Sequence, residues 1–443
     1  MSRLRAHHDS LCPEVERQLG PVLELTSKSI FEHGGIEVTA TMQGVRILEV
    51  AEHTFVPASS ALLADWGADV IKIEHVERGD AMRGLASTGM AALGGGVHAL
   101  LEHSNRGKRS LAVDLTSPDG VDLLYKIAAT SDVFLTNKLP SVRTKLGIGL
   151  EQIRAANPNI IYVRGTGQGE RGPDADKGSY DSLAFWARAG VAAGTTRPEY
   201  GGLNPPPPGP GFGDSIGAMA LAGGISSALF HRERTGEATT VDVSLLGTGM
   251  WAMGQAIALS LLLEKPWAVG PQDQLSSNPL VGTYMTEDGR GVALTCLQAG
   301  RYWAPLCEVL GRPELAVDPR FATHESLLQN AGDAVAFLTE TFAGASVEEW
   351  RRRLDVFIGQ WAIVQDTLEV AADPQSVANG YLQECRTATG VPFRLVAAPV
   401  QFDEEPAIPG RAPEFNEHAD EILGELGLDQ EAVLDLRIRG VVS

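Results

Sequence analysis

The first stretch with a regular pattern of apolar and polar positions runs from residue 44 to residue 74, and it predicts a strand, a helix and a second strand. Residues 45–50 form an apolar run rich in β-branched side chains, which is typical of a buried strand. Pro57 and Gly67 bracket apolar residues at helical spacing, and residues 70–73 predict the next strand. In such a parallel crossover the helix begins at the carboxyl edge of the first strand, where an anionic ligand would bind.

The same alternation of strand and helix signals continues to about residue 244. A basic turn runs into a strand that ends near residue 115, and further strands are predicted at 132–136, 160–164 and 239–244. Helices are predicted from Pro118, over 182–189 and from Asp214 onward, and the apolar stretch 245–263 predicts one long helix. Repeated strands and helices in this order are typical of a parallel α/β domain.

A change in pattern follows residue 265. Strand signals at 282–286 and 291–297 flank an Asp-Gly pair, which predicts a hairpin, and helical patterns continue to about residue 354. We therefore predict a smaller α/β domain over 266–395. Residues 399–413 contain several prolines, and 417–426 and 429–437 predict two closing helices.

Composition narrows the class of partner and the location. The chain has 443 residues and a formal charge of −20, which argues against nucleic acid or an anionic membrane as the partner but leaves an anionic small molecule possible. No apolar run is long enough to span a bilayer, and the four scattered cysteines lack metal or redox spacing. We predict an acidic, soluble, cytoplasmic protein without a metal, since His7 and His8 have no third ligand nearby in the sequence.

Pattern alone leaves the candidate chemistry open. Arg106, Lys108 and Arg109 form the densest basic cluster, and they suit phosphate contacts or a solvated strand edge equally well. Asp181 and Asp214 each stand at the start of a predicted helix, where an aspartate is a good cap. For Asp214 in particular, capping is the interpretation that the pattern by itself favours.

Several motifs in a fixed order nevertheless resemble one family. The most specific are LLADWGADVIKIE (62–74), GD..RG (79–84), NRGKRSLAVDL (105–115), GD...G (213–217) and ALFHRERTGEATTVDVSL (228–245). From about residue 44 to the C-terminus, the chain resembles the class III (CaiB/BaiF) CoA-transferases. That group includes formyl-CoA and carnitine CoA-transferases and α-methylacyl-CoA racemase.

The resemblance implies an architecture. It implies a Rossmann-like large domain with a parallel sheet, a smaller α/β domain, and an interlocked-ring homodimer in which each chain threads through the other. Residues 1–43 would be an N-terminal extension, 44–265 the first part of the large CoA-binding domain, 266–395 the small domain and 396–443 a segment that returns to complete the large domain.

The resemblance also implies that coenzyme A binds as acyl-CoA to loops of the large domain. The residues that we predict to contact CoA are His53, Thr54, His75, Arg83, Asn105, Arg106, Lys108, Asn137, Lys138 and Lys145. The family nucleophile is the aspartate of GD...G, here Asp214, which would attack the thioester to form a mixed anhydride and then an aspartyl-CoA thioester. The other partner would be a carboxylic acid.

Residues 180 and 181 distinguish branches within the family. The racemase branch has His then Asp at this place, whereas this chain has Tyr180 then Asp181. Tyrosine is a poor base near neutral pH. We therefore predict transfer, with Asp181 as a supporting polar group, and keep as alternatives a racemase or isomerase and a non-catalytic acyl-CoA-binding protein.

Three departures from the family bear on the substrate. Residues 55–57 are Phe-Val-Pro where small residues are usual, and 358–364 are bulkier than the corresponding family segment. No glycine-only loop lies between residues 270 and 282, which argues against formyl or oxalyl transfer. Trp186, Trp251 and Trp361 suggest a larger, apolar acyl group, although tryptophans are more often core residues.

Overall fold

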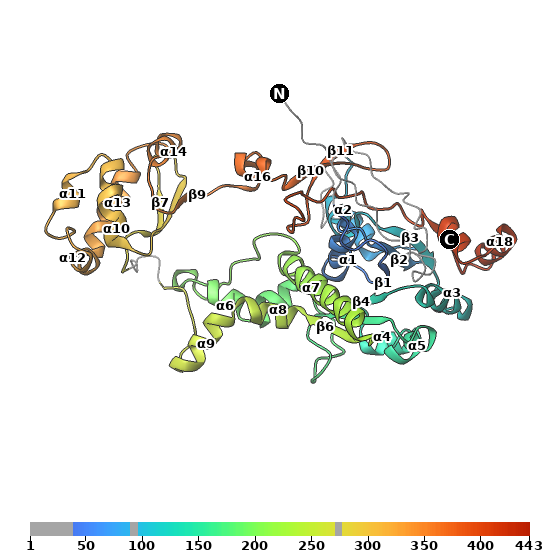
Figure 1. Ribbon diagram of the computed structural model, residues 1–443. Coiled ribbons are helices and arrows are strands. Elements are labelled where there is room, and N and C mark those ends of the chain that lie inside the picture. Colours follow the sequence, from blue (N-terminus) through green and yellow to red (C-terminus); the bar gives the residue numbers. More distant parts are fainter. Residues whose placement is uncertain (1–38, 89–95, 271–276) are drawn as a thin grey trace, which may run out of the picture.

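A computed structural model describes residues 39–88, 96–270 and 277–443, and it shows two lobes (Figure 1). The predicted N-terminal extension, with His7 and His8, lies almost entirely outside these residues. The larger lobe contains a six-stranded parallel sheet with the order β3-β2-β1-β4-β5-β6. Its strands are β1 (Arg46–Val50), β2 (Asp69–His75), β3 (Arg109–Val113), β4 (Val133–Thr136), β5 (Ile161–Thr166) and β6 (Thr240–Ser244).

Helices cover both faces of this sheet because its central strands are apolar on both sides. Ile47 of β1 faces α1 (Phe55–Asp65) and α7 (Phe212–Thr235). Leu48, the next residue, faces the opposite core. That second core is completed by α3 (Pro118–Ala129), α5 (Leu150–Ala156), α17 (Ala419–Glu425) and α18 (Gln430–Ile438). The prediction of a parallel α/β domain is confirmed.

Two predicted helices differ in the structure. Helix α1 begins at Phe55, so that Pro57 is its third residue and not its first, a position where proline still costs no helical hydrogen bond. The stretch 245–263 forms two helices, α8 (Leu245–Ala252) and α9 (Gly254–Leu263), which are bent by 69° relative to each other. The bend falls at Met253, directly before Gly254, and glycine is a common site of helix breaks.

The smaller lobe has its own core, around the antiparallel sheet β7-β8-β9. Strands β7 (Val281–Met285) and β8 (Gly291–Thr295) form the predicted hairpin, and β9 (Trp361–Ile363) adds a third strand that the pattern did not show. The helices of this lobe are α10 (Ala299–Val309), α11 (Glu314–Val317), α12 (His324–Gln329), α13 (Ala331–Phe342) and α14 (Val347–Leu354).

The C-terminal segment returns to the larger lobe. The Ala112 amide donates to Asn416 Oδ1 at 2.8 Å, and the Asp114 amide donates to the Val441 carbonyl at 2.9 Å. The hairpin of β10 (Leu382–Arg386) and β11 (Pro392–Val396) precedes it and contacts α2 (Ala99–Asn105). These contacts support a large domain built from both ends of the chain, and we propose that the return begins before residue 396, at this hairpin.

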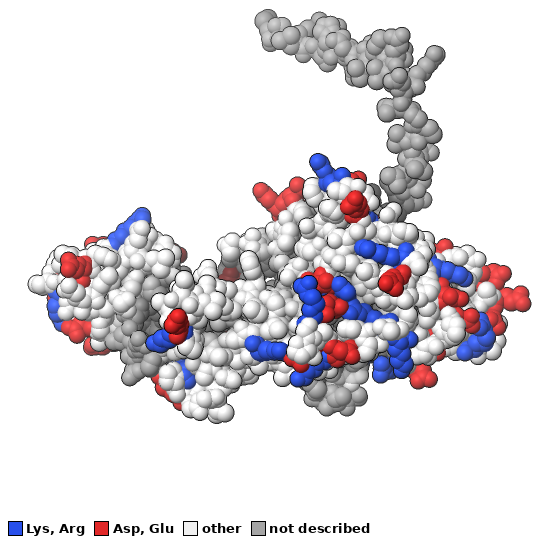
Figure 2. Space-filling model, turned by 90° about the horizontal axis from the view of Figure 1, so that it is seen from below, with Lys and Arg blue, Asp and Glu red and all other residues white. Residues whose placement is uncertain are grey.

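The surface view shows acidic and basic side chains interspersed on one face (Figure 2). Within the described parts of the chain, no single helix has the length and apolarity to cross a membrane. The bent pair α8 and α9 reaches the required values only when both helices are taken together.

Candidate active site at the carboxyl edge of the sheet

The strand order places a topological switch point between β1 and β4, where the chain leaves the sheet in opposite directions. The loops after these two strands are joined there. Asn137 follows β4, and its Nδ2 donates to the Glu52 carbonyl at 2.7 Å while its Oδ1 accepts from the Glu52 amide at 3.3 Å. Ligands of open α/β sheets bind in the crevice at such a point.

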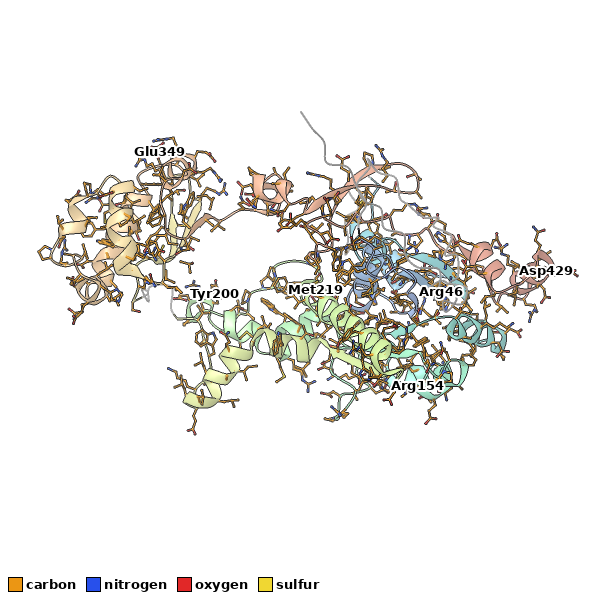
Figure 3. The ribbon with its side chains drawn as sticks, in the orientation of Figure 1. Arg46, Arg154, Tyr200, Met219, Glu349 and Asp429 are labelled. Carbon is orange, nitrogen blue, oxygen red and sulfur yellow. The ribbon has the colours of Figure 1, made fainter. Side chains whose placement is uncertain are left out.

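Asp214 lies in the first turn of α7, beside the loop that follows β1. The helix is capped by Gly211, whose φ of 65° is in the left-handed region, so Asp214 is the third helical residue and not the cap. A Cβ built on Gly211 would lie 3.1 Å from Thr54 Cγ2 and 3.8 Å from Asp214 Oδ2. Thr54 and Asp214 therefore face each other across Gly211. Figure 3 labels Met219, which lies further along the same helix.

The Asp214 carboxyl group has an altered affinity for protons. Burial, and secondarily the negative charge of Asp181, raise the pKa of Asp214 to about 7. A half-buried carboxylate whose pKa is raised in this way is a stronger base and nucleophile than a solvated one. The interpretation of Asp214 as the helix cap is wrong because Gly211 occupies the cap position.

Asp181 and Tyr180 are brought to the same place from a different element. Asp181 precedes the π-helix η2 (Ser182–Arg188) but makes no cap hydrogen bond to it. Its Oδ2 instead accepts from the Gly213 amide at 3.2 Å, so the predicted capping role is wrong. Tyr180 is 60% exposed and packs edge-on against the His53 ring, with 5.6 Å between ring centroids.

The glycines of the GD...G motif are required by close packing around Asp214. A Cβ on Gly213 would lie 2.6 Å from Cγ of Phe185, and one on Gly217 would lie 2.6 Å from Cε2 of the buried Phe55. The motif therefore lets the first turns of α7 approach η2 and α1 closely enough to place Asp214 next to Asp181 and Thr54.

We predict that Gly217→Ala lowers the stability of the protein by about 1–3 kcal/mol, because the added methyl overpacks against Phe55. The matched control is Gly223→Ala in the same helix, where a Cβ meets nothing within 4 Å. Replacing a helical glycine by alanine at an open position should raise stability by about 0.5–1 kcal/mol. Calorimetry of both variants measures the difference, and equal effects would show that the contact with Phe55 is unimportant.

Six of the residues predicted to contact CoA lie at or near this edge. They are His53, Thr54, His75, Asn137, Lys138 and Lys145. His75 is the exposed last residue of β2, and Lys145 is exposed in the last turn of α4 (Pro140–Lys145). Lys138 Nζ pairs with the Glu52 carboxylate, so its charge is partly neutralised.

The other four predicted CoA residues are committed to protein partners. Arg106 is buried and forms a two-pronged ion pair with Asp65, and Lys108 Nζ is buried against Glu49 at 2.8 Å. Asn105 is fully buried and accepts from Lys108, while Arg83 Nε pairs with Glu74 at 2.7 Å. Because these ion pairs engage the charged atoms of Arg83, Arg106 and Lys108, we omit these three residues from the proposed CoA site. We also omit Asn105, which is fully buried.

Sequence reasoning missed the buried charge cluster beneath the loop after β1. Glu49 and Lys72 are fully buried and 2.8 Å apart, and Lys72 also pairs with Asp80 Oδ2 at 2.7 Å. A signal was present, since Glu49 and Lys72 interrupt strands that were otherwise apolar. Charged residues inside buried strands are rare unless paired.

The two buried lysines differ in their electrostatic surroundings. Burial lowers the pKa of Lys108 to about 7; the Glu49 carboxylate opposes this shift, and the nearby charge of Lys72 adds to it. Burial also acts on Lys72, but Asp80, Glu49 and Glu74 outweigh it and raise the pKa of Lys72 above its usual value. The cluster therefore holds Lys72 firmly charged.

Among the described residues, no group of three or more His, Cys, Asp or Glu side chains is arranged to hold a metal ion. The comparison with protein families gives a match to CoA-transferase family III over residues 42–419. The chain belongs to CoA-transferase family III. It is thus a class III CoA-transferase, an enzyme for which an acyl-CoA and a carboxylic acid are the implied substrates.

Characterised members of this family align along almost their whole length. The chain is 30% identical over 406 residues to (R)-2-hydroxy-4-methylpentanoate CoA-transferase of Clostridioides difficile, covering 90% of this chain and 99% of the relative. It is 29% identical over 404 residues to cinnamoyl-CoA:phenyllactate CoA-transferase of Clostridium sporogenes, covering 90% and 96%. A crystal structure of a CaiB/BaiF family protein from Brucella suis superimposes with a TM-score of 0.74 at 28% identity, covering 87% and 99%.

Within this family III enzyme, aromatic side chains pack together at the start of α7, the helix that carries Asp214. Phe212, two residues before Asp214, packs edge-on against Phe185 and Trp186, with ring centroids 6.2 and 6.5 Å apart. Trp186 is buried and its Nε1 donates to the Pro205 carbonyl at 2.9 Å. Of the three tryptophans considered from the sequence, Trp186 is the one in contact with this cluster. Trp251 is exposed on α8, and Trp361 lies in β9 of the smaller lobe.

Proposed function

We propose that this enzyme transfers CoA from an acyl-CoA to a carboxylic acid through covalent intermediates on Asp214. The observation that carries the proposal is the half-buried Asp214 carboxyl group, with its pKa raised to about 7, held beside Asp181 at the switch point of the sheet. Tyr180 stands where a second acid–base group would be needed for racemisation, so the residues favour transfer.

The reaction then runs in four displacements. Asp214 attacks the thioester carbonyl, the C–S bond breaks, and a mixed anhydride and CoA thiolate form. The thiolate attacks the aspartyl carbonyl of the anhydride, which releases the donor acid and leaves an aspartyl-CoA thioester. The acceptor carboxylate attacks this thioester to give a second anhydride and thiolate. The thiolate finally attacks the acceptor acyl carbon, so that acceptor-CoA leaves and the Asp214 carboxylate is restored.

The electrostatics of the site favour these intermediates. Free Asp214 carries its negative charge in a partly desolvated place near Asp181, which is the reason that its pKa is raised. Both the anhydride and the thioester at Asp214 are neutral. Acylation therefore removes the unfavourable charge, and the energy of the free carboxylate is raised relative to the covalent state.

We further propose that CoA binds along the edge formed by His53, Thr54, His75, Asn137 and the lysines 138 and 145, and that the acyl group is apolar and bulky. The aromatic residues Phe212 and Trp186, which pack on each other at the start of α7, suit a branched or aromatic side chain. Relatives that act on 2-hydroxy-4-methylpentanoate and on cinnamoyl-CoA with phenyllactate support this class. We also propose that the enzyme acts in the cytoplasm.

We propose a homodimer in which the two chains interlock. Helices α8 and α9 leave large apolar side chains uncovered in the single chain, including Trp251 at 86% and Leu262 at 79% exposure. Contiguous apolar surface of this kind marks an interface. Light scattering of the purified enzyme should give twice the chain mass, and a monomer at micromolar concentration would contradict the proposal.

The function is tested by mass spectrometry after incubation with acyl-CoAs and hydroxylamine. The panel comprises 2-hydroxy-4-methylpentanoyl-, cinnamoyl-, phenyllactyl-, succinyl- and glutaryl-CoA. Hydroxylamine converts an aspartyl thioester or anhydride to a hydroxamate, which we expect on Asp214 with the branched or aromatic donors. Exchange of solvent deuterium into the acyl α-carbon without a hydroxamate would indicate a racemase, and binding without either reaction would indicate a binding protein.

A further inference from the structure

The loop that links β1 to α1 is held at three consecutive residues by partners from three different elements. Lys72 Nζ of β2 donates to the Ala51 carbonyl at 2.9 Å. Asn137 makes two hydrogen bonds to the main chain of Glu52. The His53 amide donates to Asp80 Oδ1 at 3.0 Å. A loop fixed in this way has little freedom to move relative to the sheet.

The conformation that is fixed is an unfavourable one. His53 has φ of 69°, in the left-handed region where a residue with a side chain is strained. Such conformations persist only when the surroundings determine them, and they concentrate at functional sites. The hydrogen bond from the His53 amide to Asp80 is the contact made by His53 itself among those that hold the loop.

Asp80 is itself held in place by charge. It is 1% exposed, and its Oδ2 lies 2.7 Å from Lys72 Nζ while its Oδ1 also accepts from the Met82 amide at 2.8 Å. Lys72 is fully buried and is anchored in turn by Glu49. An apolar pair could fill the same space at no loss of stability, but it would not accept the His53 amide hydrogen.

The side chains at the end of this fixed segment, those of His53 and Thr54, lie next to Tyr180 and Asp214. The His53 ring packs on Tyr180, and Thr54 faces Asp214 across Gly211. A shift of the loop would therefore change the space next to Asp214 in which the thioester must lie. Displacements of about 1 Å at such a place cost about 100-fold in rate.

We propose that the buried Asp80–Lys72 pair positions the β1–α1 loop opposite Asp214, so that Asp80 is a positioning residue for the acylation step. This inference rests on the proposed role of Asp214. It gives a function to a charge cluster that takes no direct part in the reaction. It also gives a reason for the burial of two charged pairs beneath the carboxyl edge of the sheet.

The test compares Asp80→Asn with Asp80→Ala. Asparagine keeps an acceptor for the His53 amide but loses the charge that pairs with Lys72, whereas alanine loses both. At saturating acyl-CoA, the single-turnover rate of hydroxamate formation on Asp214 should fall about 10-fold in Asp80→Asn and about 100-fold in Asp80→Ala. The KM for acyl-CoA should rise by a smaller factor than kcat falls, because only His53 and Thr54 of the proposed CoA contacts lie on this loop.

The matched control is Asp65→Asn, which breaks the buried ion pair with Arg106 at the far end of α1. It should lower the melting temperature about as much as Asp80→Asn while leaving the trapping rate within about twofold of wild type. If the two variants slow trapping equally, Asp80 has only a structural role and the proposal is overturned.

A second measurement does not depend on the enzymatic reaction. Hydrogen–deuterium exchange of the segment 51–56 should be slow in the wild type and in Asp65→Asn, and fast in Asp80→Ala, because the His53 amide loses its acceptor. If the wild type forms no hydroxamate while this exchange pattern is found, the role proposed for Asp214 is wrong, but Asp80 still holds the β1–α1 loop. If segment 51–56 exchanges equally in all variants, Asp80 does not hold the loop and the proposal is overturned.

Discussion

Asp214→Asn and Asp214→Ala should lower kcat by at least about 1,000-fold, since neither side chain can form the anhydride or the thioester. The loss should appear in kcat and not in the KM for acyl-CoA, because the residues proposed to contact CoA lie on the loops after β1, β2 and β4. Coupled assays of acceptor-CoA formation measure both constants, and hydroxylamine should leave the chain mass of both variants unchanged.

The control for this prediction is Asp435→Asn, which removes a carboxylate from the surface of α18, where it pairs with Arg439. It should keep kcat within about twofold of wild type. Activity of Asp214→Ala above about one tenth of the wild-type value would assign the covalent chemistry to another residue. The nearest carboxylate is then Asp181, which accepts from the Gly213 amide.

The fold of the larger lobe was accessible from sequence because its strands are short apolar runs separated by helices with clear ends. Pro118 opens α3 and Gly236 closes α7 in a left-handed conformation, as such residues commonly do. The break between α8 and α9 at Met253 could not be predicted from the sequence. Residues 245–263 are apolar throughout, and such a pattern does not show where a helix bends or which side is covered.

The candidate site, like the fold, could be predicted from the sequence only in part. Asp214 was found through the GD...G motif, and the structure gives the motif a physical basis in the close packing of Gly213 and Gly217. The prediction of CoA contacts for Arg106 and Lys108 did not anticipate that both are paired with buried carboxylates. Their partners Asp65 and Glu49 precede them by 41 and 59 residues, and local pattern carries no information on such pairings.

The raised pKa of Asp214 makes a second prediction, about stability. Native Asp214 keeps its proton up to about pH 7, whereas in the unfolded chain it loses the proton near its model value of 3.8. Between these values the native state binds more protons than the unfolded state, so this group makes stability fall as pH rises. Asp214→Asn, which is neutral at every pH, should therefore be the more stable protein at pH 8, by at most ~4 kcal/mol.

Calorimetry at pH 8 and at pH 4.5 separates this effect from ordinary mutational damage. At pH 8 the melting temperature of Asp214→Asn should lie above that of the wild type. At pH 4.5 most of this difference should be gone, because native Asp214 is then protonated and the pH is less than one unit above the unfolded value of 3.8. The rate of hydroxamate formation in the wild type should rise with pH through about 7, since the attacking group is the carboxylate. A variant that is less stable than the wild type at pH 8, together with a rate that is flat from pH 5 to pH 8, would mean that the Asp214 carboxylate is not destabilised. The enzyme would then lack the stored electrostatic energy that favours acylation, and the barrier would have to be lowered by contacts to the substrate instead.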